Sequence, residues 1–141
     1  MKSIAETIKQ AQLTVLIIED DEMFANLLKK WIEEDATRVD IVDSAERGTF
    51  LVTSLKPDII LLDNNLPKLS GRDVIELYLD LSPNSKIFMM TAAEIDSHQE
   101  EIIVRGAMQF LDKRGLQKKI LQGILLEVAA SIMDKKSSSK A

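Results

Sequence analysis

The 141-residue sequence contains no cysteine, no glycine-rich loop and no long apolar segment. Without cysteine the chain cannot form disulfides, use a thiol nucleophile or bind zinc through thiolates. The lack of a glycine-rich loop after the first predicted strand argues against nucleotide binding. No apolar run approaches the roughly 20 residues that cross a bilayer, and residues 1–12 lack the apolar core of a signal peptide. We therefore expect a cytoplasmic protein without membrane contact.

A surplus of basic residues is also absent, because the formal net charge is −5. A face that binds nucleic acid is usually basic, so we expect no direct contact with nucleic acid. The length suits one domain, and the balance of 45% hydrophobic and 29% charged residues is that of an ordinary globular chain. The sequence therefore predicts one folded domain, with an acidic balance that suits a cation or a basic partner.

Hydrophobic periodicity predicts five strands that alternate with helices. The predicted strands cover residues 14–18, 38–43, 59–62, 86–90 and 107–112. The predicted helices cover residues 22–34, 44–55, 72–81, 94–105 and 116–133, and the first dozen residues suggest a further helical extension. This alternation is typical of an α/β fold in which helices cover both faces of a mainly parallel, doubly wound sheet.

Polar side chains follow four of the predicted strands, at Glu19, Asp20, Asp63, Thr91 and Lys113. The carboxyl ends of parallel strands meet at one edge of a sheet, so we expect these side chains to lie together. Clustered carboxylates repel one another, and a hard cation such as Mg²⁺ relieves that repulsion. A carboxylate held beside Mg²⁺ and a lysine is a good acceptor for a phosphoryl group. The pattern therefore favours an aspartyl-phosphate site.

Four segments resemble the signature blocks of the response-regulator receiver family of two-component signalling, the family of CheY-like domains. They are VLIIEDDEMF, DIILLDNNLPKLSG, IFMMTA and GAMQFLDK, in the family's order and spacing. The similarity covers about residues 13–130. It implies a flavodoxin-like fold with five parallel strands in the order 2-1-3-4-5. It also divides the chain into an extension at 1–12, a receiver domain at 13–133 and a polar tail or linker start at 134–141.

The resemblance assigns the chemistry of the site to particular positions. Asp63 matches the phosphoacceptor, and Lys113 matches the lysine that contacts the phosphoryl group. Glu19 and Asp20 match the acidic pair that holds Mg²⁺ together with Asp63, and Asp20 is the better candidate for a direct ligand. The backbone carbonyl of Asn65 matches the position that completes the metal site.

Further positions match the parts of the family that respond to phosphorylation. Thr91 matches the switch hydroxyl, which donates to the phosphoryl group, and Phe110 matches the switch aromatic that moves with it. Pro67 and Gly71 match the turn after the acceptor. Simpler interpretations remain beside these, because Phe110 suits ordinary core packing equally well. His98, the only histidine, is expected on an exposed helix and has no predicted role.

The sequence departs from the family pattern after the lysine, where Arg114 replaces the usual proline. A cis peptide bond without proline costs about 2.5–4 kcal/mol, so we predict a trans bond before Arg114. The same change predicts a locally altered loop and a shifted lysine. Asn64 is more polar than the usual residue after the acceptor, although it still supplies its backbone N–H.

Three functions are compatible with these residues. The first is a receiver that takes a phosphoryl group from a sensor histidine kinase or a histidine phosphotransfer protein and then switches its contact with a downstream effector. It turns over no external substrate, and the family resemblance allows a homodimer. The second is a receiver-like module that binds proteins without phosphate. The third is a phosphatase of the haloacid-dehalogenase type, which Asn65 disfavours because a second aspartate normally occupies that position.

Overall fold

The strands form a single parallel sheet in the order β2-β1-β3-β4-β5. The computed structural model describes residues 2–36, 38–66, 71–92 and 106–139. The strands are β1 (Thr14–Ile18), β2 (Arg38–Val42), β3 (Ile59–Asp63), β4 (Lys86–Thr91) and β5 (Gln109–Asp112). This is the predicted order, and each pair of neighbouring strands is parallel. The predicted fifth strand begins at Gln109 rather than at residue 107.

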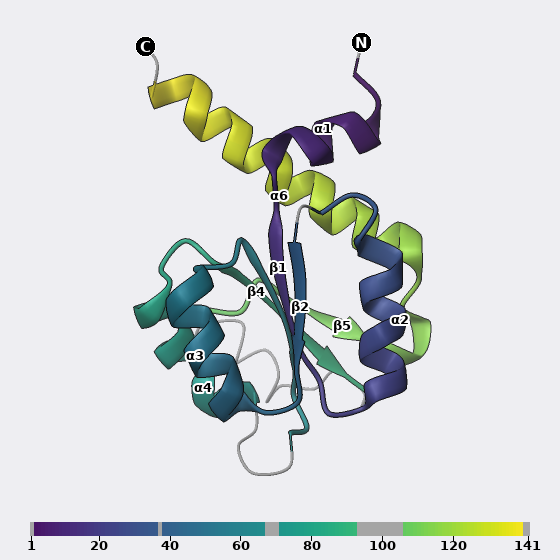
Figure 1. Cartoon of the computed structure of the whole chain (residues 1–141), viewed down its shortest axis with the longest axis vertical. Coiled ribbons are helices and arrows are strands. Elements are labelled where there is room, and N and C mark those ends of the chain that lie inside the picture. Colours follow the sequence, from purple (N-terminus) through teal and green to yellow (C-terminus); the bar gives the residue numbers. More distant parts are fainter. Residues whose placement is uncertain (1, 37, 67–70, 93–105, 140–141) are drawn as a thin grey trace.

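Helices cover both faces of this sheet, as predicted (Figure 1). The described helices are α1 (Ile4–Ala11), α2 (Glu22–Ile32), α3 (Ala45–Leu55), α4 (Gly71–Leu81) and α6 (Lys118–Ser139). Helices α2 and α6 pack on one face, whereas α3 and α4 pack on the other. The helix predicted at 94–105, with His98, lies outside the described residues, and so does Pro67.

Side-chain caps determine where the helices on both faces begin. Asp21 precedes α2, and its carboxylate accepts a hydrogen bond of 3.1 Å from the backbone N–H of Phe24. Ser44 precedes α3, and its hydroxyl accepts a hydrogen bond of 3.2 Å from the backbone N–H of Arg47. Each cap satisfies an N–H group that the first helical turn leaves without a partner. The chain therefore turns into a helix soon after β1 and β2 end.

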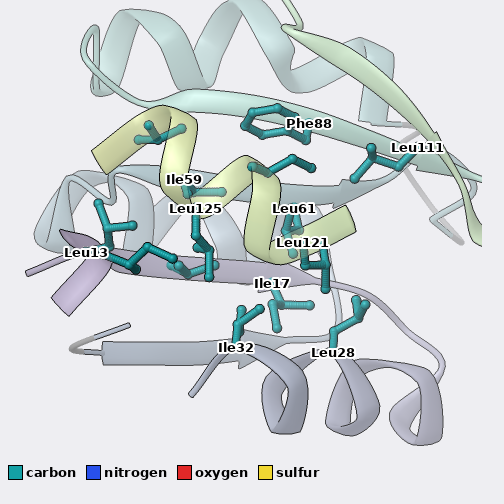
Figure 2. Packing of buried hydrophobic residues seen from close by; sticks show 14 of the residues in the cluster. Leu13, Ile17, Leu28, Ile32, Ile59, Leu61, Phe88, Leu111, Leu121 and Leu125 are labelled. Carbon is teal, nitrogen blue, oxygen red and sulfur yellow. The ribbon is translucent and has the colours of Figure 1, made fainter. Parts of the chain in front are cut away.

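The central strand β3 is buried along its whole length because it contributes side chains to two hydrophobic clusters. Ile59 and Leu61 face the cluster under α2 and α6. Ile60 and Leu62 face the cluster under α3 and α4. Figure 2 shows the first cluster, where Leu121 and other α6 side chains lie against the strands. Each such fully buried side chain stabilises the fold by about 1.5–3 kcal/mol. The run 59–62 is apolar throughout because both faces of the strand are covered.

The two ends of the described chain pack against each other beyond the sheet. Helix α1 crosses α6 (Figure 1), and Ile8 of α1 is completely buried in the cluster that α6 shares. The predicted helical extension is therefore present. Helix α6 continues to Ser139 rather than ending near residue 133, because no proline or glycine follows Gly123 to stop it. The domain boundaries themselves stay a prediction.

Within the ranges that the structure describes, no helix combines the length and the hydropathy of a membrane span.

Candidate functional site

Two buried carboxylates lie side by side at the carboxyl edge of the sheet. Asp63 is the last residue of β3, and Glu19 directly follows β1; each is 1% exposed. The backbone N–H of Glu19 donates to the carbonyl of Val42 at 3.0 Å, which ties it to β2. The backbone N–H of Asn65 donates to Asp63 Oδ1 at 3.0 Å. Sheet hydrogen bonding and a tight turn therefore hold both acids in place.

Lys113 reaches both carboxylates from the end of β5. Its Nζ lies 2.5 Å from Glu19 Oε1 and 3.2 Å from Asp63 Oδ1. The ammonium also lies 5.2 Å from the centroid of the Phe24 ring, within the range of a cation–π contact. The peptide bond between Lys113 and Arg114 is trans, as predicted. The lysine reaches both acids with Arg114 after it, so Arg114 does not remove it from the site. The predicted alteration of the loop and shift of the lysine stay predictions.

The two acids and the lysine shift one another's proton affinity. Burial, together with the neighbouring Asp63, raises the pKa of Glu19 to about 8. Burial also acts to raise the pKa of Asp63, but Glu19, the Asn65 N–H and Lys113 outweigh it and hold that pKa below its usual value. Burial acts to lower the pKa of Lys113, and the two carboxylates outweigh it and raise that pKa. Asp63 is therefore the ionised member of the acid pair.

Three carboxylates at this edge could share a cation. Glu19, Asp20 and Asp63 each present an oxygen, and these atoms lie within 4.8 Å of one another. Both carboxylate oxygens of Glu19 are buried, Oε1 contacts the Lys113 ammonium as an ion pair, and Asp20 is exposed at the mouth of the cluster. An all-oxygen set with one solvent-facing member suits Mg²⁺, which keeps several waters when it binds. The residues present therefore fit the predicted metal.

The remaining predicted residues occupy the same edge or the strands next to it. Thr91 ends β4, is completely buried and lies in register with Asp112 of β5. Phe110 is also buried, and it packs in the cluster under α3 and α4. The side chain of Asn65 is exposed, whereas its backbone N–H faces Asp63. Their predicted roles stay predictions.

Two residues at the site escaped the sequence reasoning. Phe24 fits the apolar stripe of α2, and that pattern gave no sign that its ring would also meet the Lys113 ammonium. Asp112 was simply the last strand residue, although it caps the short 3₁₀ helix η1 (Lys113–Gly115) that follows. An aspartate next to the lysine was the available signal, because aspartate often caps the turn that follows it.

The sequence model of the protein family described as "response regulator receiver domain" matches residues 15–125, most of the chain. The chain belongs to the response regulator receiver domain family. The chemotaxis protein CheY of Listeria monocytogenes is 29% identical over 77% of this chain and 93% of its own length. The nitrate/nitrite response regulator NarL of Escherichia coli is 31% identical over 74% of this chain and 49% of its own length. The protein-glutamate methylesterase/protein-glutamine glutaminase of Maricaulis maris is 32% identical over 70% of this chain.

This receiver domain spans about half of the nitrate regulator, and the match covers 26% of the methylesterase. Solved receiver structures share its fold. A CheY-like receiver domain protein from Methanospirillum hungatei superposes with a TM-score of 0.79 at 21% identity, over 87% of this chain and 98% of that chain. A response regulator from Burkholderia pseudomallei, solved with a phosphorylated aspartic acid and a calcium ion, gives 0.74 at 21% identity over 92% and 75%. These likenesses establish the fold.

Proposed function

We propose that this receiver domain accepts a phosphoryl group on Asp63 from the phosphohistidine of a sensor kinase or a histidine phosphotransfer protein. One observation carries the proposal: the buried Asp63 carboxylate lies 3.2 Å from the Lys113 ammonium and beside a second carboxylate at the carboxyl edge of the sheet. A carboxylate must be ionised to act as a nucleophile, and the lowered pKa of Asp63 keeps it so at neutral pH.

The transfer itself exchanges one bond to phosphorus for another. An oxygen of Asp63 attacks the phosphorus, an O–P bond forms, the N–P bond to the donor histidine breaks, and the released imidazole nitrogen takes up a proton. The Lys113 ammonium, 3.2 Å from Asp63 Oδ1, neutralises negative charge on the transferred group. The N–H of Asn65 keeps the carboxylate from rotating during attack. Asn65 thus positions the attacking carboxylate and Lys113 neutralises the charge of the phosphoryl group, which are the main requirements of phosphoryl transfer.

A bound Mg²⁺ would neutralise further charge on the phosphoryl oxygens. Glu19, Asp20 and Asp63 would hold it, with the backbone carbonyl of Asn65 as the remaining predicted ligand. Without a cation, Glu19 competes with Asp63 for the charge of Lys113, since both acids contact the same ammonium. Glu19 therefore serves the site best when a cation satisfies its two oxygens.

The signal would leave the site through Thr91 and β5. The Thr91 side chain is buried at the end of β4, next to the strand that carries Phe110. Donation from the Thr91 hydroxyl to the phosphoryl group would favour one of two arrangements of this edge, a shift between existing states. The face formed by β5 and its neighbouring helices would then bind a downstream effector. Neither a contact with nucleic acid nor turnover of an external substrate is part of the proposal.

The test is the intact mass of the protein after incubation with phosphoramidate or acetyl phosphate, with and without Mg²⁺. We expect one phosphoryl group, dependent on Mg²⁺, and its loss in Asp63→Asn. Asp43→Asn is the matched control, because Asp43 lies close by after β2 but pairs with Arg47 at 3.4 Å. Uptake that persists in Asp63→Asn contradicts the proposal. The absence of uptake by the folded wild type would favour a module that binds partners without phosphate.

A further inference from the structure

Asp112 and Arg114 flank Lys113 in the chain, and their side chains pair with each other. Asp112 Oδ1 accepts hydrogen bonds from the Arg114 backbone N–H at 2.9 Å and from Arg114 Nε at 3.0 Å. Arg114 Nη2 donates to Asp112 Oδ2 at 3.0 Å. Planar guanidinium and carboxylate groups match in this two-point geometry, which fixes orientation as well as distance. Three hydrogen bonds therefore join the residues that flank the lysine of the site.

We propose that this Asp112–Arg114 clamp positions Lys113 toward Glu19 and Asp63, in place of the proline that the family usually has after the lysine. The inference rests on the proposed function, since Lys113 matters there as the cation beside the phosphoacceptor. Asp112 and Arg114 are positioning residues, because they act through Lys113.

The short helix η1 explains how the clamp directs the lysine. Asp112 is its N-cap, so the cap sets the backbone at Lys113, the first helical residue. Successive side chains of a 3₁₀ helix point about 120° apart, so Lys113 and Arg114 leave the backbone in different directions. The Lys113 side chain is 19% exposed, whereas the Arg114 side chain is 57% exposed. When Arg114 bonds back to Asp112 on the outside, Lys113 is left pointing inward.

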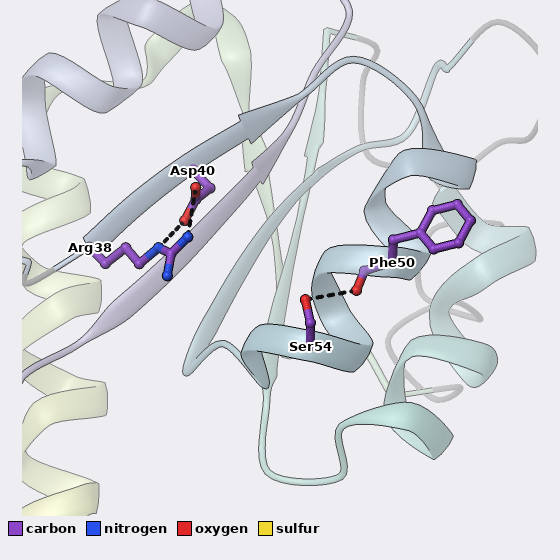
Figure 3. Close-up of polar contacts among 4 residues, drawn as sticks. All are labelled: Arg38, Asp40, Phe50 and Ser54. Atoms are coloured by element: carbon purple, nitrogen blue, oxygen red, sulfur yellow. Dashed lines mark hydrogen bonds and ion pairs between the residues drawn. The ribbon is translucent and has the colours of Figure 1, made fainter.

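A similar arginine–aspartate pair, Arg38 and Asp40, lies at the other edge of the sheet, away from the site. Arg38 Nε donates to Asp40 Oδ2 at 2.7 Å within the edge strand β2, again between residues two apart (Figure 3). The residue between them is the apolar Val39, which packs against the core. The Arg38–Asp40 pair thus shares the chemistry and the edge position of the Asp112–Arg114 clamp, but it encloses no residue of the site. It provides a control for the loss of a surface pair.

The first test measures the position of Lys113 without any phosphoryl chemistry. The full chain is labelled with limiting acetic anhydride, and the acetylation of Lys113 relative to exposed Lys30 is read by peptide mass spectrometry. A lysine held against two acids labels slowly. We expect Asp112→Ala to raise the relative labelling of Lys113 about tenfold, the equivalent of one charge-assisted hydrogen bond. Asp40→Ala should leave it unchanged. Unchanged labelling of Lys113 in a folded Asp112→Ala protein overturns the clamp.

The second test measures the consequence for phosphoryl transfer. We expect Asp112→Ala to lower the maximal rate of phosphoramidate-driven uptake about tenfold, with little change in the Mg²⁺ concentration for half-maximal rate. Asp112→Asn should recover most of that rate, because its amide oxygen still accepts the Arg114 N–H and caps η1. Increased labelling of Lys113 without a change in rate would overturn the positioning role.

The two measurements separate failure of the clamp from failure of the proposed function. If the wild type takes up no phosphoryl group, the proposed function fails, and the labelling experiment still decides whether Asp112 positions the lysine. If the wild type is phosphorylated and Asp112→Ala behaves like Asp40→Ala in both experiments, only the clamp fails.

Discussion

The polar groups at the two ends of the sheet differ in whether they have hydrogen-bond partners. At the amino end, the Asp58 carboxylate accepts a hydrogen bond of 2.9 Å from the Thr14 N–H. The Ser85 hydroxyl lies 2.6 Å from that of Ser82 and donates to the carbonyl of Pro57. The half-buried Asp58 and the buried Ser82 and Ser85 all have hydrogen-bond partners, as polar groups removed from water normally do. At the amino end these hydrogen bonds therefore join strands to the loops that precede them.

At the carboxyl end, buried polar atoms are left without hydrogen-bond partners. Among the residues that the structure describes, these atoms are Oε1 and Oε2 of Glu19 and Oδ1 of Asn64. The Lys113 ammonium approaches Glu19 Oε1 as an ion pair, but it also serves Asp63. Buried groups left unsatisfied cost stability, so their concentration at one end supports the ligand site that we propose there.

Replacing Lys113 should lower the stability of the protein more than any of the other substitutions. We expect Lys113→Met to lower the free energy of unfolding by about 3 kcal/mol at neutral pH without Mg²⁺, because two buried acids lose their shared cation. Urea denaturation measures the loss, and added Mg²⁺ should recover part of it. Lys118→Met is the control, since Lys118 pairs with Glu34 at 3.8 Å on the surface. Equal losses in both variants would contradict the comparison between the two ends.

Mg²⁺ should stabilise the folded domain by binding at the carboxyl end of the sheet. At a concentration about 100 times its Kd, the cation should raise the free energy of unfolding of the wild type by about 2.7 kcal/mol. Asp20→Ala should lose most of that gain, because it removes one of the three clustered carboxylates. Thermal unfolding with and without Mg²⁺ measures the difference, and Asp43→Asn should behave like the wild type. A full gain in Asp20→Ala would exclude Asp20 as a ligand.

A change at the amino end should affect stability without affecting the chemistry. We expect Ser85→Ala to lower the free energy of unfolding by about 1–3 kcal/mol, because it leaves buried partners unsatisfied. Phosphoryl uptake should be retained. Ser54→Ala is the control, because the exposed Ser54 hydroxyl donates to the Phe50 carbonyl within α3 (Figure 3). Loss of uptake in a folded Ser85→Ala protein would show that the two ends are coupled.

The smallest effect should appear as a dependence on pH. The pKa of Glu19 is raised from 4.5 to about 8, so its favourable contribution to stability is complete below pH 4.5 and is lost as pH rises through about 8. Relative to Glu19→Gln, the metal-free wild type should therefore lose stability over this range. We expect a loss of at least the order of 1 kcal/mol, the equivalent of one pKa unit between the two states, and Asp63 does not offset it because its lowered pKa lies below this range. Parallel denaturation curves at pH 5 and pH 8 measure it, and an unchanged difference would contradict the shift.

The fold could be predicted from the sequence because burial in the core determines where apolar residues occur along each strand and helix. The run 59–62 had to be apolar throughout, since alternate residues meet helices on opposite faces of the sheet. The end of α6 was harder to predict. Its last residues are polar, and polarity resembled a solvated tail, but the absence of proline and glycine after Gly123 and the contact with α1 let the helix continue to Ser139.

The amino-acid sequence by itself determined which side chains gather at the carboxyl edge. Parallel strands end together, so the residues after them, Glu19, Asp63 and Thr91 among them, had to meet there. Only the tertiary structure decided how charge is shared among them. Which acid keeps its proton depends on burial and on distances of a few ångströms to Lys113. Those distances follow from packing between segments far apart in the chain, which no local pattern encodes.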